Sequence, residues 1–292
     1  MIKELHNVTA ILNKTNPYII DAQNNVLLTD YYKFRPMKQK LKPEVTKMFT
    51  YDSLYYIPCE ENIYHATVHS SLYFAIIPQD TIVLSNNCKV CDFYAKHFKI
   101  HVLDTHGIYH VNTLFYFENK GPTYMQPSNF DSMTFNRFLM STSKICKVCP
   151  QLSKRIYIKR KSPKRNIENF QIVEDMLHTK GFETVYMEDL SLTQQINYFY
   201  NAKFIIAVHG AGLTNIIYCQ KDCTVIELKH KCMNEFLIHN CYAQLANQAK
   251  LQNYHVHYVQ HKQLSKCKSK DYNLVIDSNA LSTYIDNLEK ST

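Results

Sequence analysis

Apolar and polar positions follow two alternating patterns along the second half of the chain. Short runs rich in β-branched and aromatic residues, bounded by polar residues, are typical of buried strands. We predict five such strands, at Arg155–Ile158, Thr184–Met187, Lys203–Val208, Thr224–Leu228 and Tyr254–Val259. The segments after them predict helices at Asn166–Lys180, Ser191–Tyr200, Leu213–Tyr218, Asn234–Lys250 and Ser278–Leu288. This alternation predicts an α/β fold, with a parallel sheet covered by helices on both faces.

Two of these helices carry recognisable end signals, and a third has a distinct apolar side. Asn166 is suited to cap the first helix at its start, and Gly181 follows its end in the position that favours a left-handed backbone. Ser191 and Gln194 form the pattern of a capping box. Leu281, Ile285 and Leu288 lie on one side of the last helix.

The first half of the chain has a weaker pattern but is also of α/β type. Strand-like runs occur at Tyr18–Ile20, Leu54–Ile57, Thr81–Leu84, Ile100–Leu103 and Leu114–Phe117. Helices are predicted at Tyr64–Ala75, Cys88–His97 and Asp131–Lys144. We therefore predict an N-terminal domain over residues 1–148 and a second domain over residues 149–270. Residues 271–292 are expected to form a C-terminal helix that packs back on the N-terminal domain.

Composition excludes several classes of protein. The 292 residues are 46% hydrophobic and 20% charged, which rules out a disordered or collagen-like chain. No apolar stretch is long enough to span a membrane. Lys and Arg number 33 against 25 Asp and Glu, and the net charge of +8 favours an anionic partner such as a nucleotide, a nucleic acid or a phosphate-rich surface.

The chain start and the amino-acid bias bear on location. Residues Met1–His6 lack the apolar run and cleavage site of a secretory signal. We expect a cytoplasmic protein with mostly reduced cysteines, and a Golgi or ER protein only if a leader precedes this sequence. The few glycines, the absence of Trp and the 22 Tyr residues are typical of an AT-rich genome and suggest a bacterial or viral source.

The strongest candidate for chemistry is the turn His209–Asn215. It holds two of the five glycines of the chain, follows a predicted strand and opens a predicted helix. Such a turn at the carboxyl end of a strand is a common ligand site, because glycines admit close approach and the helix N-terminus favours negative charge. A tight turn without a ligand is the alternative. The spacing matches neither the dinucleotide fingerprint nor a Walker A loop.

Four segments occur in an ordered pattern, at Arg155–Arg160, Tyr186–Gln195, His209–Asn215 and Val225–Leu228. Together they resemble glycosyltransferase family sixty-one, which includes plant xylan arabinosyl- and xylosyltransferases and animal protein O-N-acetylglucosaminyltransferases. In the first half, only Asn62–His65 resembles the family, through its Asn-x-Tyr-His segment. The resemblance implies a GT-B fold, in which two Rossmann-like domains face each other across a cleft and the C-terminal domain binds the nucleotide.

The resemblance also implies a set of donor-binding residues. Arg160 would hold a diphosphate by bidentate hydrogen bonds. Glu227 would accept both ribose hydroxyls, and His209 with the backbone amides that follow would complete the diphosphate site. The remaining residues of that turn are Gly210, Ala211, Gly212, Leu213, Thr214 and Asn215. Glu188 and Asp189 are expected to be structural.

No Asp-x-Asp pair, the usual metal-binding feature of GT-A glycosyltransferases, occurs in the chain. Cationic side chains and a helix N-terminus would then stabilise the leaving group. We therefore expect an enzyme that needs neither a metal ion nor a cofactor.

An inverting transfer needs a general base for the acceptor hydroxyl. His65 and His69 are four residues apart on a predicted helix and so share one side of it. His65 is the leading candidate and His69 the second. Family members often carry an acidic residue near position 69, so the identity of the base stays open, and two polar helix residues without a catalytic role are the alternative.

Two pairs with the same middle residues, Cys88–Cys91 and Cys146–Cys149, could form a four-cysteine zinc site. The 54 residues between the pairs are far more than the roughly 15–20 of compact zinc ribbons. A labile disulfide and plain thiols are the alternatives, and plain thiols are favoured.

We expect an inverting hexosyl- or pentosyltransferase of glycan biosynthesis. It would move a sugar from a nucleotide-sugar, of which a UDP-sugar is favoured, to a hydroxyl of a glycan or a protein. Two alternatives remain open. One is a nucleic-acid-binding protein that uses the basic run 159–165, although no nucleic-acid partner is expected under the favoured reading. The other is an inactive GT-B domain kept for interaction.

Overall fold

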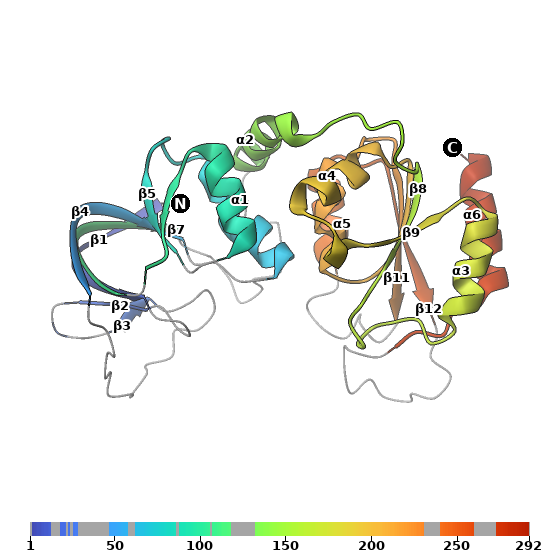
Figure 1. Cartoon of the computed structure of the whole chain (residues 1–292), viewed down its shortest axis with the longest axis horizontal. Coiled ribbons are helices and arrows are strands. Elements are labelled where there is room, and N and C mark those ends of the chain that lie inside the picture. The colour runs from blue at the N-terminus through green and yellow to red at the C-terminus, as the bar shows by residue number, and fades with distance from the viewer. Residues whose placement is uncertain are drawn as a thin grey trace. The chain divides into compact units, whose positions relative to one another are not determined.

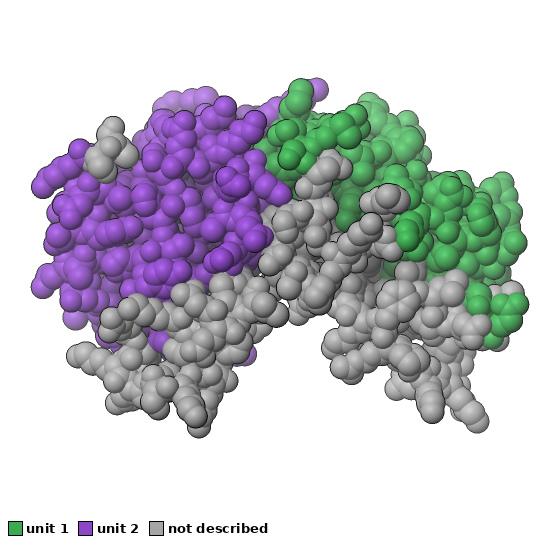
Figure 2. Space-filling model, turned by 180° about the vertical axis from the view of Figure 1, so that it is seen from behind, with its two compact units in different colours: residues 1–141 green, residues 142–292 purple. Residues whose placement is uncertain are grey.

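The computed structural model describes residues 2–12, 18–21, 23, 26–28, 47–57, 62–85, 88–105, 107–117, 132–230, 240–259 and 273–291. The chain forms two compact units, residues 1–141 and residues 142–292 (Figure 2, green and purple). The division falls seven residues before the predicted domain boundary. Each unit has its own sheet and its own helices, so both are of α/β type.

Unit 1 is built on a seven-stranded mixed sheet with the order β3-β2-β1-β7-β4-β5-β6. Strands β7, β4, β5 and β6 are mutually parallel, whereas β1 is antiparallel to both β2 and β7. The strands are β1 (Ile2–Leu12), β2 (Tyr18–Ile20), β3 (Val26–Leu28), β4 (Met48–Tyr56), β5 (Ile82–Leu84), β6 (His101–Leu103) and β7 (Gly107–Phe117). Their core side chains include Val8, Leu54, Tyr109 and Leu114.

All five predicted strands of the first half are present, but β4 and β7 are longer than predicted and β1 and β3 were not predicted at all. The first half of β1 alternates between exposed and half-exposed residues and carries Lys3, Glu4 and His6. Its pairing with β7, about a hundred residues away, makes it a strand, and a local apolar pattern does not record such pairing.

The helices of unit 1 are short and varied. They are the π-helix η1 (His65–Ser70), the 3₁₀-helices η2 (Ser71–Ala75) and η4 (Ser143–Ile145), and the α-helices α1 (Lys89–Phe98) and α2 (Ser132–Thr142), with η4 and the end of α2 falling in unit 2. The predicted helix Tyr64–Ala75 therefore exists, but as a π-helix followed by a 3₁₀-helix. Helix α1 ends at Lys99 in a left-handed conformation.

Unit 2 is a five-stranded sheet with the order β12-β11-β10-β8-β9, and all its strands are parallel. The strands are β8 (Arg155–Lys159), β9 (Glu183–Tyr186), β10 (Phe204–Val208), β11 (Thr224–His230) and β12 (Asn253–Val259). Each lies within two residues of its predicted ends. Every residue of β10 and β11 is buried, because helices cover both faces of the sheet.

Figure 1 shows α3 and α6 on one face of this sheet and α4 and α5 on the other. The helices of unit 2 are α3 (Phe170–Thr179), η5 (Met187–Asp189), α4 (Leu192–Asn201), η6 (Ala211–Tyr218), α5 (Cys241–Gln248) and α6 (Ser278–Ser291). The capping box of Ser191 and Gln194 is present, and Gly181 has a positive φ of 78°. The first part of the predicted helix Asn234–Lys250 lies outside the described residues.

The C-terminal helix α6 belongs to unit 2, whereas the sequence analysis set residues 271–292 apart from both domains. Leu281 and Ile285 instead belong to the core of unit 2, together with Val173 and Leu177 of α3. A helix with one apolar side is stabilised by the nearest exposed apolar surface, and here that surface is α3.

Helix α3 also differs from its prediction, because it begins at Phe170 and not after Asn166. The backbone of residues 166–168 pairs with the segment before α6. Leu274 donates its N–H to the Asn166 carbonyl at 2.7 Å, and Glu168 donates to the Leu274 carbonyl at 2.8 Å. These bonds use the backbone groups that a first helical turn would need.

Candidate functional site

The strand order of unit 2 marks one end of its sheet as a ligand site. Across the sheet the strands lie in the chain order second, first, third, fourth and fifth, so the winding reverses between β8 and β10. In open α/β sheets, ligands bind beyond the carboxyl ends of the strands at such a reversal. Arg160 directly follows β8 and His209 directly follows β10. The topology therefore brings both predicted residues to this point.

Arg160 lies over Gly210. A Cβ atom built on Gly210 would stand 1.7 Å from the NH1 atom of Arg160, which no real pair of atoms tolerates. The φ of Gly210 is 171°, an extended conformation open to any residue. Gly210 is therefore required for space and not for backbone freedom, and the space is taken by the guanidinium of Arg160.

A second guanidinium, that of Arg165, reaches the same place. The NH1 atoms of Arg160 and Arg165 each lie 3.4 Å from the carbonyl oxygen of His209. Both guanidiniums thus lie beside one carbonyl at the start of η6, where the first backbone amides of a helix have no intrahelical partner. The sequence analysis named Arg165 only as part of the basic run. No sequence signal could have singled it out.

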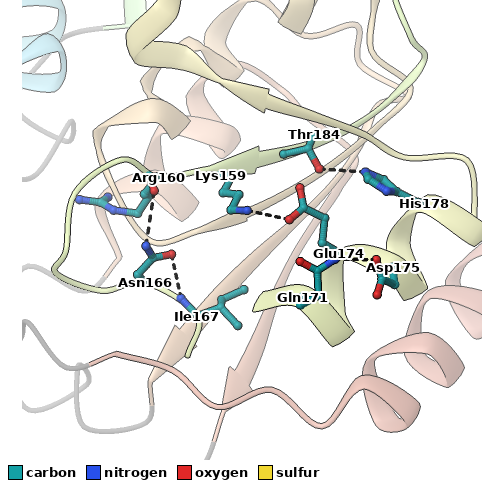
Figure 3. Close-up of polar contacts among 9 residues, drawn as sticks. All are labelled: Lys159, Arg160, Asn166, Ile167, Gln171, Glu174, Asp175, His178 and Thr184. Atoms are coloured by element: carbon teal, nitrogen blue, oxygen red, sulfur yellow. Dashed lines mark hydrogen bonds and ion pairs between the residues drawn. The ribbon is translucent and has the colours of Figure 1, made fainter. Parts of the chain in front are cut away.

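The loop that carries both arginines is held by its own hydrogen bonds. Arg165 has a left-handed backbone, with φ of 55°. Asn166 follows it, and its side-chain NH₂ lies 3.5 Å from the carbonyls of Arg160 and Ser162 while its oxygen accepts the N–H of Ile167 at 2.9 Å (Figure 3). Asn273 accepts the N–H of Asn166 at 3.0 Å. The segment before α6 thus fixes the loop that presents the arginines.

The lysines of the basic run have other partners. Lys159 forms an ion pair with Glu174 of α3 at 2.6 Å, seen in Figure 3, and both side chains are largely buried. Its ammonium also lies 4.2 Å from the centre of the Phe170 ring. Lys161 pairs with Asp189 at the surface, and its backbone N–H donates to Glu188 at 3.3 Å. These contacts support the expected structural role of Glu188 and Asp189.

His209 is held by a buried acid. Its Nδ1 is hydrogen-bonded to Oε1 of Glu227, and Tyr254 donates its hydroxyl to Oε2 of Glu227 at 2.8 Å. The ring of Tyr242 meets the imidazole edge-on, with 5.0 Å between the centres. Burial lowers the pKa of His209, and the hydrogen bond and charge of Glu227 only partly offset this effect. The imidazole is thus a fixed and buried part of the turn.

A glutamine joins two of the predicted segments. Gln195 of α4 donates its NH₂ to the carbonyls of Met187 at 2.9 Å and Leu190 at 3.2 Å. Its side-chain oxygen accepts the NH₂ of Asn215 at 3.0 Å. The segments Tyr186–Gln195 and His209–Asn215 are therefore one assembly, and Asn215 anchors η6 on α4.

A comparison with known protein families shows which family the chain belongs to. The sequence profile of the glycosyltransferase 61 family matches residues 8–226. The chain belongs to the glycosyltransferase 61 family. The match begins in β1, so it includes the first half, where the sequence analysis saw only Asn62–His65. No curated protein matches the chain.

Within this glycosyltransferase, the predicted turn residues divide into two groups. Gly210, Ala211 and Gly212 form the start of η6 beside the arginines. Leu213, Thr214 and Asn215 are fully buried, and the Thr214 hydroxyl donates to the Ala211 carbonyl at 2.7 Å. The side chains of the second group therefore shape the turn, and a ligand would meet the first group.

Glu227 lies differently from the ribose-binding residue that the resemblance implies. Its side chain is only 1% exposed, and His209 and Tyr254 occupy its two oxygens. At this exposure the carboxylate has almost no accessible surface for ribose hydroxyls. The contact between Glu227 and Tyr254 could not be predicted from the sequence. It arises because β11 and β12 are parallel neighbours, with Tyr254 opposite Val225, two residues before Glu227.

Unit 1 carries the predicted base candidates on η1. Positions 65 and 69 are four residues apart, close to one turn of either an α-helix or a π-helix, so they stay on one side. The side chains of His65 and His69 lie outside the described residues. Asn62 starts this segment, because its side chain accepts the N–H of Tyr64 at 2.9 Å and its carbonyl accepts that of Ala66 at 2.9 Å.

The two cysteine pairs are not alike. Cys91 is in a disulfide and Cys88 is not, so these two are not bonded to each other. Cys146 and Cys149 are free thiols. Among the residues that the structure describes, no group of three or more His, Cys, Asp or Glu side chains is placed to hold a metal ion. None of the helices described is long and apolar enough to cross a membrane.

Proposed function

We propose that this member of the glycosyltransferase 61 family is an inverting, metal-independent enzyme of GT-B type that uses a UDP-sugar. The observation that carries the proposal is the pair of guanidiniums, Arg160 and Arg165, at the start of η6 and at the winding reversal of a parallel sheet. A diphosphate supplies the dense negative charge that such a pair attracts.

In the proposed reaction, the oxygen of an acceptor hydroxyl attacks the anomeric carbon of the donor. The bond from that carbon to the diphosphate oxygen breaks, and a general base on unit 1 takes the proton of the hydroxyl. Charge develops on the leaving diphosphate. Arg160, Arg165 and the amides of η6 are positioned to stabilise it, which is the role a metal ion has in other glycosyltransferases.

A thermal-shift screen of UDP, GDP and CMP and of their sugar conjugates tests the donor class. A ligand present at 100 times its Kd stabilises the folded state by about 2.7 kcal/mol, so a true donor raises the melting temperature. We expect UDP compounds to do so. A response to another nucleotide alone would overturn the UDP assignment.

Transfer to a panel of glycan and protein acceptors, followed as UDP release, tests the activity itself. Donor binding without hydrolysis or transfer to any acceptor would indicate an inactive domain. Chelator-treated enzyme should retain most of its activity, and activity that vanishes with chelator and returns with manganese would refute metal independence. Lys159 and Lys161 of the basic run are engaged in ion pairs, which leaves fewer of its cations for the nucleic-acid alternative.

A further inference from the structure

His209 opens the turn beside the two arginines, and one nitrogen of its imidazole is engaged within the protein. Its Nδ1 is committed to Glu227, and its ring is only 3% exposed. Within the described part of the chain, Nε2 has no hydrogen-bond partner. A buried ring with one fixed and one unused nitrogen is suited to a single ligand contact.

The partner on Nδ1 determines what Nε2 can do. An ionised carboxylate only accepts hydrogen bonds, so Nδ1 carries a proton toward Glu227. In the neutral ring Nε2 is then a bare acceptor, which a phosphate oxygen repels. Only the doubly protonated imidazolium can donate to Glu227 and to a phosphate at the same time.

Burial is the main cause of the lowered pKa of His209 before a ligand arrives, and the charges of Lys229 and Arg165 act in the same direction. Arg160 and Arg165 lie on its carbonyl side, and Lys229 lies two residues beyond Glu227 on β11. Glu227 is the acid that faces the ring. The other titratable neighbours are Cys241 and Tyr242 of α5 and Tyr254 of β12, and burial raises the pKa of Cys241 to about 12 and raises that of Tyr254, so both are neutral.

We infer that the His209–Glu227 pair takes up one proton when the donor diphosphate binds. The proton comes from solvent to Nε2, the imidazolium then donates to a phosphate oxygen, and the proton returns to solvent after UDP leaves. Glu227 balances the new positive charge, and Tyr254 orients Glu227. The inference rests on the proposed function, because it needs a diphosphate in the site.

The direction of the pH dependence follows from linkage. The bound diphosphate raises the pKa of His209 above its value in the free protein. Affinity is therefore highest at low pH and falls as pH rises through the pKa of the complex. Between the two pKa values, binding takes up a measurable fraction of a proton.

Titration calorimetry with UDP on the full chain measures this uptake directly. The window is pH 7–9, where the terminal phosphate of UDP, with a pKa of about 6, is already ionised. Runs in two buffers of different ionisation heat give the number of protons bound. We expect proton uptake that is largest near pH 7, and a Kd that rises with pH by at most tenfold per pH unit until the pKa of the complex is passed.

Glu227→Gln keeps the size of the side chain and removes its charge. We expect this variant to bind UDP about tenfold more weakly at pH 7, without proton uptake and with a flat pH profile. Tyr254→Phe leaves Glu227 charged, so proton uptake should persist. Tyr258→Phe, on the same strand but 40% exposed, is the matched control and should behave as the wild type.

The outcomes separate the two proposals. If the wild type binds none of the nucleotides tested, the proposed function and this inference both fail. If the wild type binds UDP without proton uptake, or if Glu227→Gln takes up the same proton, the inference alone is overturned. Should melting curves show that Glu227→Gln is unfolded, His209→Gln replaces it, and UDP binding with undiminished proton uptake would then contradict the inference.

Discussion

The sheet of unit 2 is parallel throughout, whereas the sheet of unit 1 joins an antiparallel set of strands to a parallel one. In both units the candidate residues follow the carboxyl end of a parallel strand: Arg160 follows β8, and His65 comes shortly after β4. Unit 2 gathers charge there, through two arginines and a buried His–Glu pair.

Unit 1 offers instead a π-helix with two histidine positions. π-helical turns are rare and occur frequently at functional sites. The difference suggests a division of roles in which unit 2 binds the donor and unit 1 supplies the base. Variants whose UDP affinity and turnover are measured separately test this division of roles.

The largest effect is expected from His65→Ala. Loss of a general base should lower turnover by roughly 10²–10⁴-fold. Affinity for UDP, measured by calorimetry, should stay nearly unchanged, because the proposal assigns nucleotide binding to unit 2. His69→Ala should have a smaller effect.

Two results would break the division of roles. If His65→Ala loses UDP affinity, His65 belongs to the nucleotide site. If both single variants and the double variant keep near-normal turnover, the base lies elsewhere and η1 is structural.

The next effect concerns the arginine that the sequence did not single out. Arg165→Ala should weaken UDP binding about tenfold or more, since loss of one charge-assisted hydrogen bond costs about 1.5–3 kcal/mol. Arg165→Lys should recover only part of the affinity, because it keeps the charge but not the planar fork. Lys164→Ala, the neighbouring exposed cation, is the control in the same titration. Equal affinities for all three would place Arg165 outside the site.

A third prediction concerns the segment that enters unit 2. The Asn201 side chain accepts the N–H of Cys149 at 2.8 Å and donates to the carbonyls of Lys147 at 2.7 Å and Asn197 at 2.8 Å. Asn201→Leu leaves these backbone groups unpaired and should lower the free energy of unfolding by about 2–3 kcal/mol.

Urea denaturation measures this change, with Asn287→Leu on the exposed side of α6 as the control. The folded variant should bind UDP as tightly as the wild type, because the hydrogen bonds of the Asn201 side chain do not involve the arginines. A large loss of affinity at full folding would show that this segment shapes the donor site.

The smallest effect is expected at Glu174. Burial works to raise the pKa of Glu174, but the hydrogen bonds from Lys159 and Thr184 and the charge of Lys159 outweigh it, so the pKa lies below its usual value. The pair therefore stabilises the fold above the usual Glu pKa of about 4.3, and this contribution is lost as pH falls through the lower folded pKa.

Glu174→Gln should cost about 1 kcal/mol at pH 7, at the upper end for such pairs, and almost nothing at pH 3. Asp189→Asn, which breaks the exposed pair with Lys161, is the matched control and should cost less. A cost for Glu174→Gln that is the same at both pH values would mean that the ion pair does not contribute.

The strands of unit 2 could be predicted from sequence because strands buried on both faces need continuous apolar runs, as Lys203–Val208 shows. Strand β1 could not, because its polar first half is a strand only through its pairing with β7. Arg160 and His209 followed from the ordered motif. The role of Arg165 could not be predicted, because its position depends on its own left-handed backbone and on the hydrogen bonds of Asn166. The role of Tyr254 could not be predicted either, because it depends on the pairing of β11 with β12.

The claim that Arg160 and the glycine turn form one donor site has a direct test. UDP affinity is measured for the wild type, Arg160→Ala, Gly210→Ala and the double variant. A new methyl group at Gly210 meets only the end of the Arg160 side chain, so Gly210→Ala should fold normally while it displaces the guanidinium. Lys203→Ala is the control, because Lys203 precedes β10 at the end of the strand away from the turn and forms only an exposed ion pair with Asp222.

We predict that Arg160→Ala and Gly210→Ala each weaken UDP binding about tenfold or more, and that the double variant binds no more weakly than either single variant. Lys203→Ala should bind UDP as the wild type does. Wild-type affinity in Gly210→Ala, or losses that add in the double variant, would contradict the account.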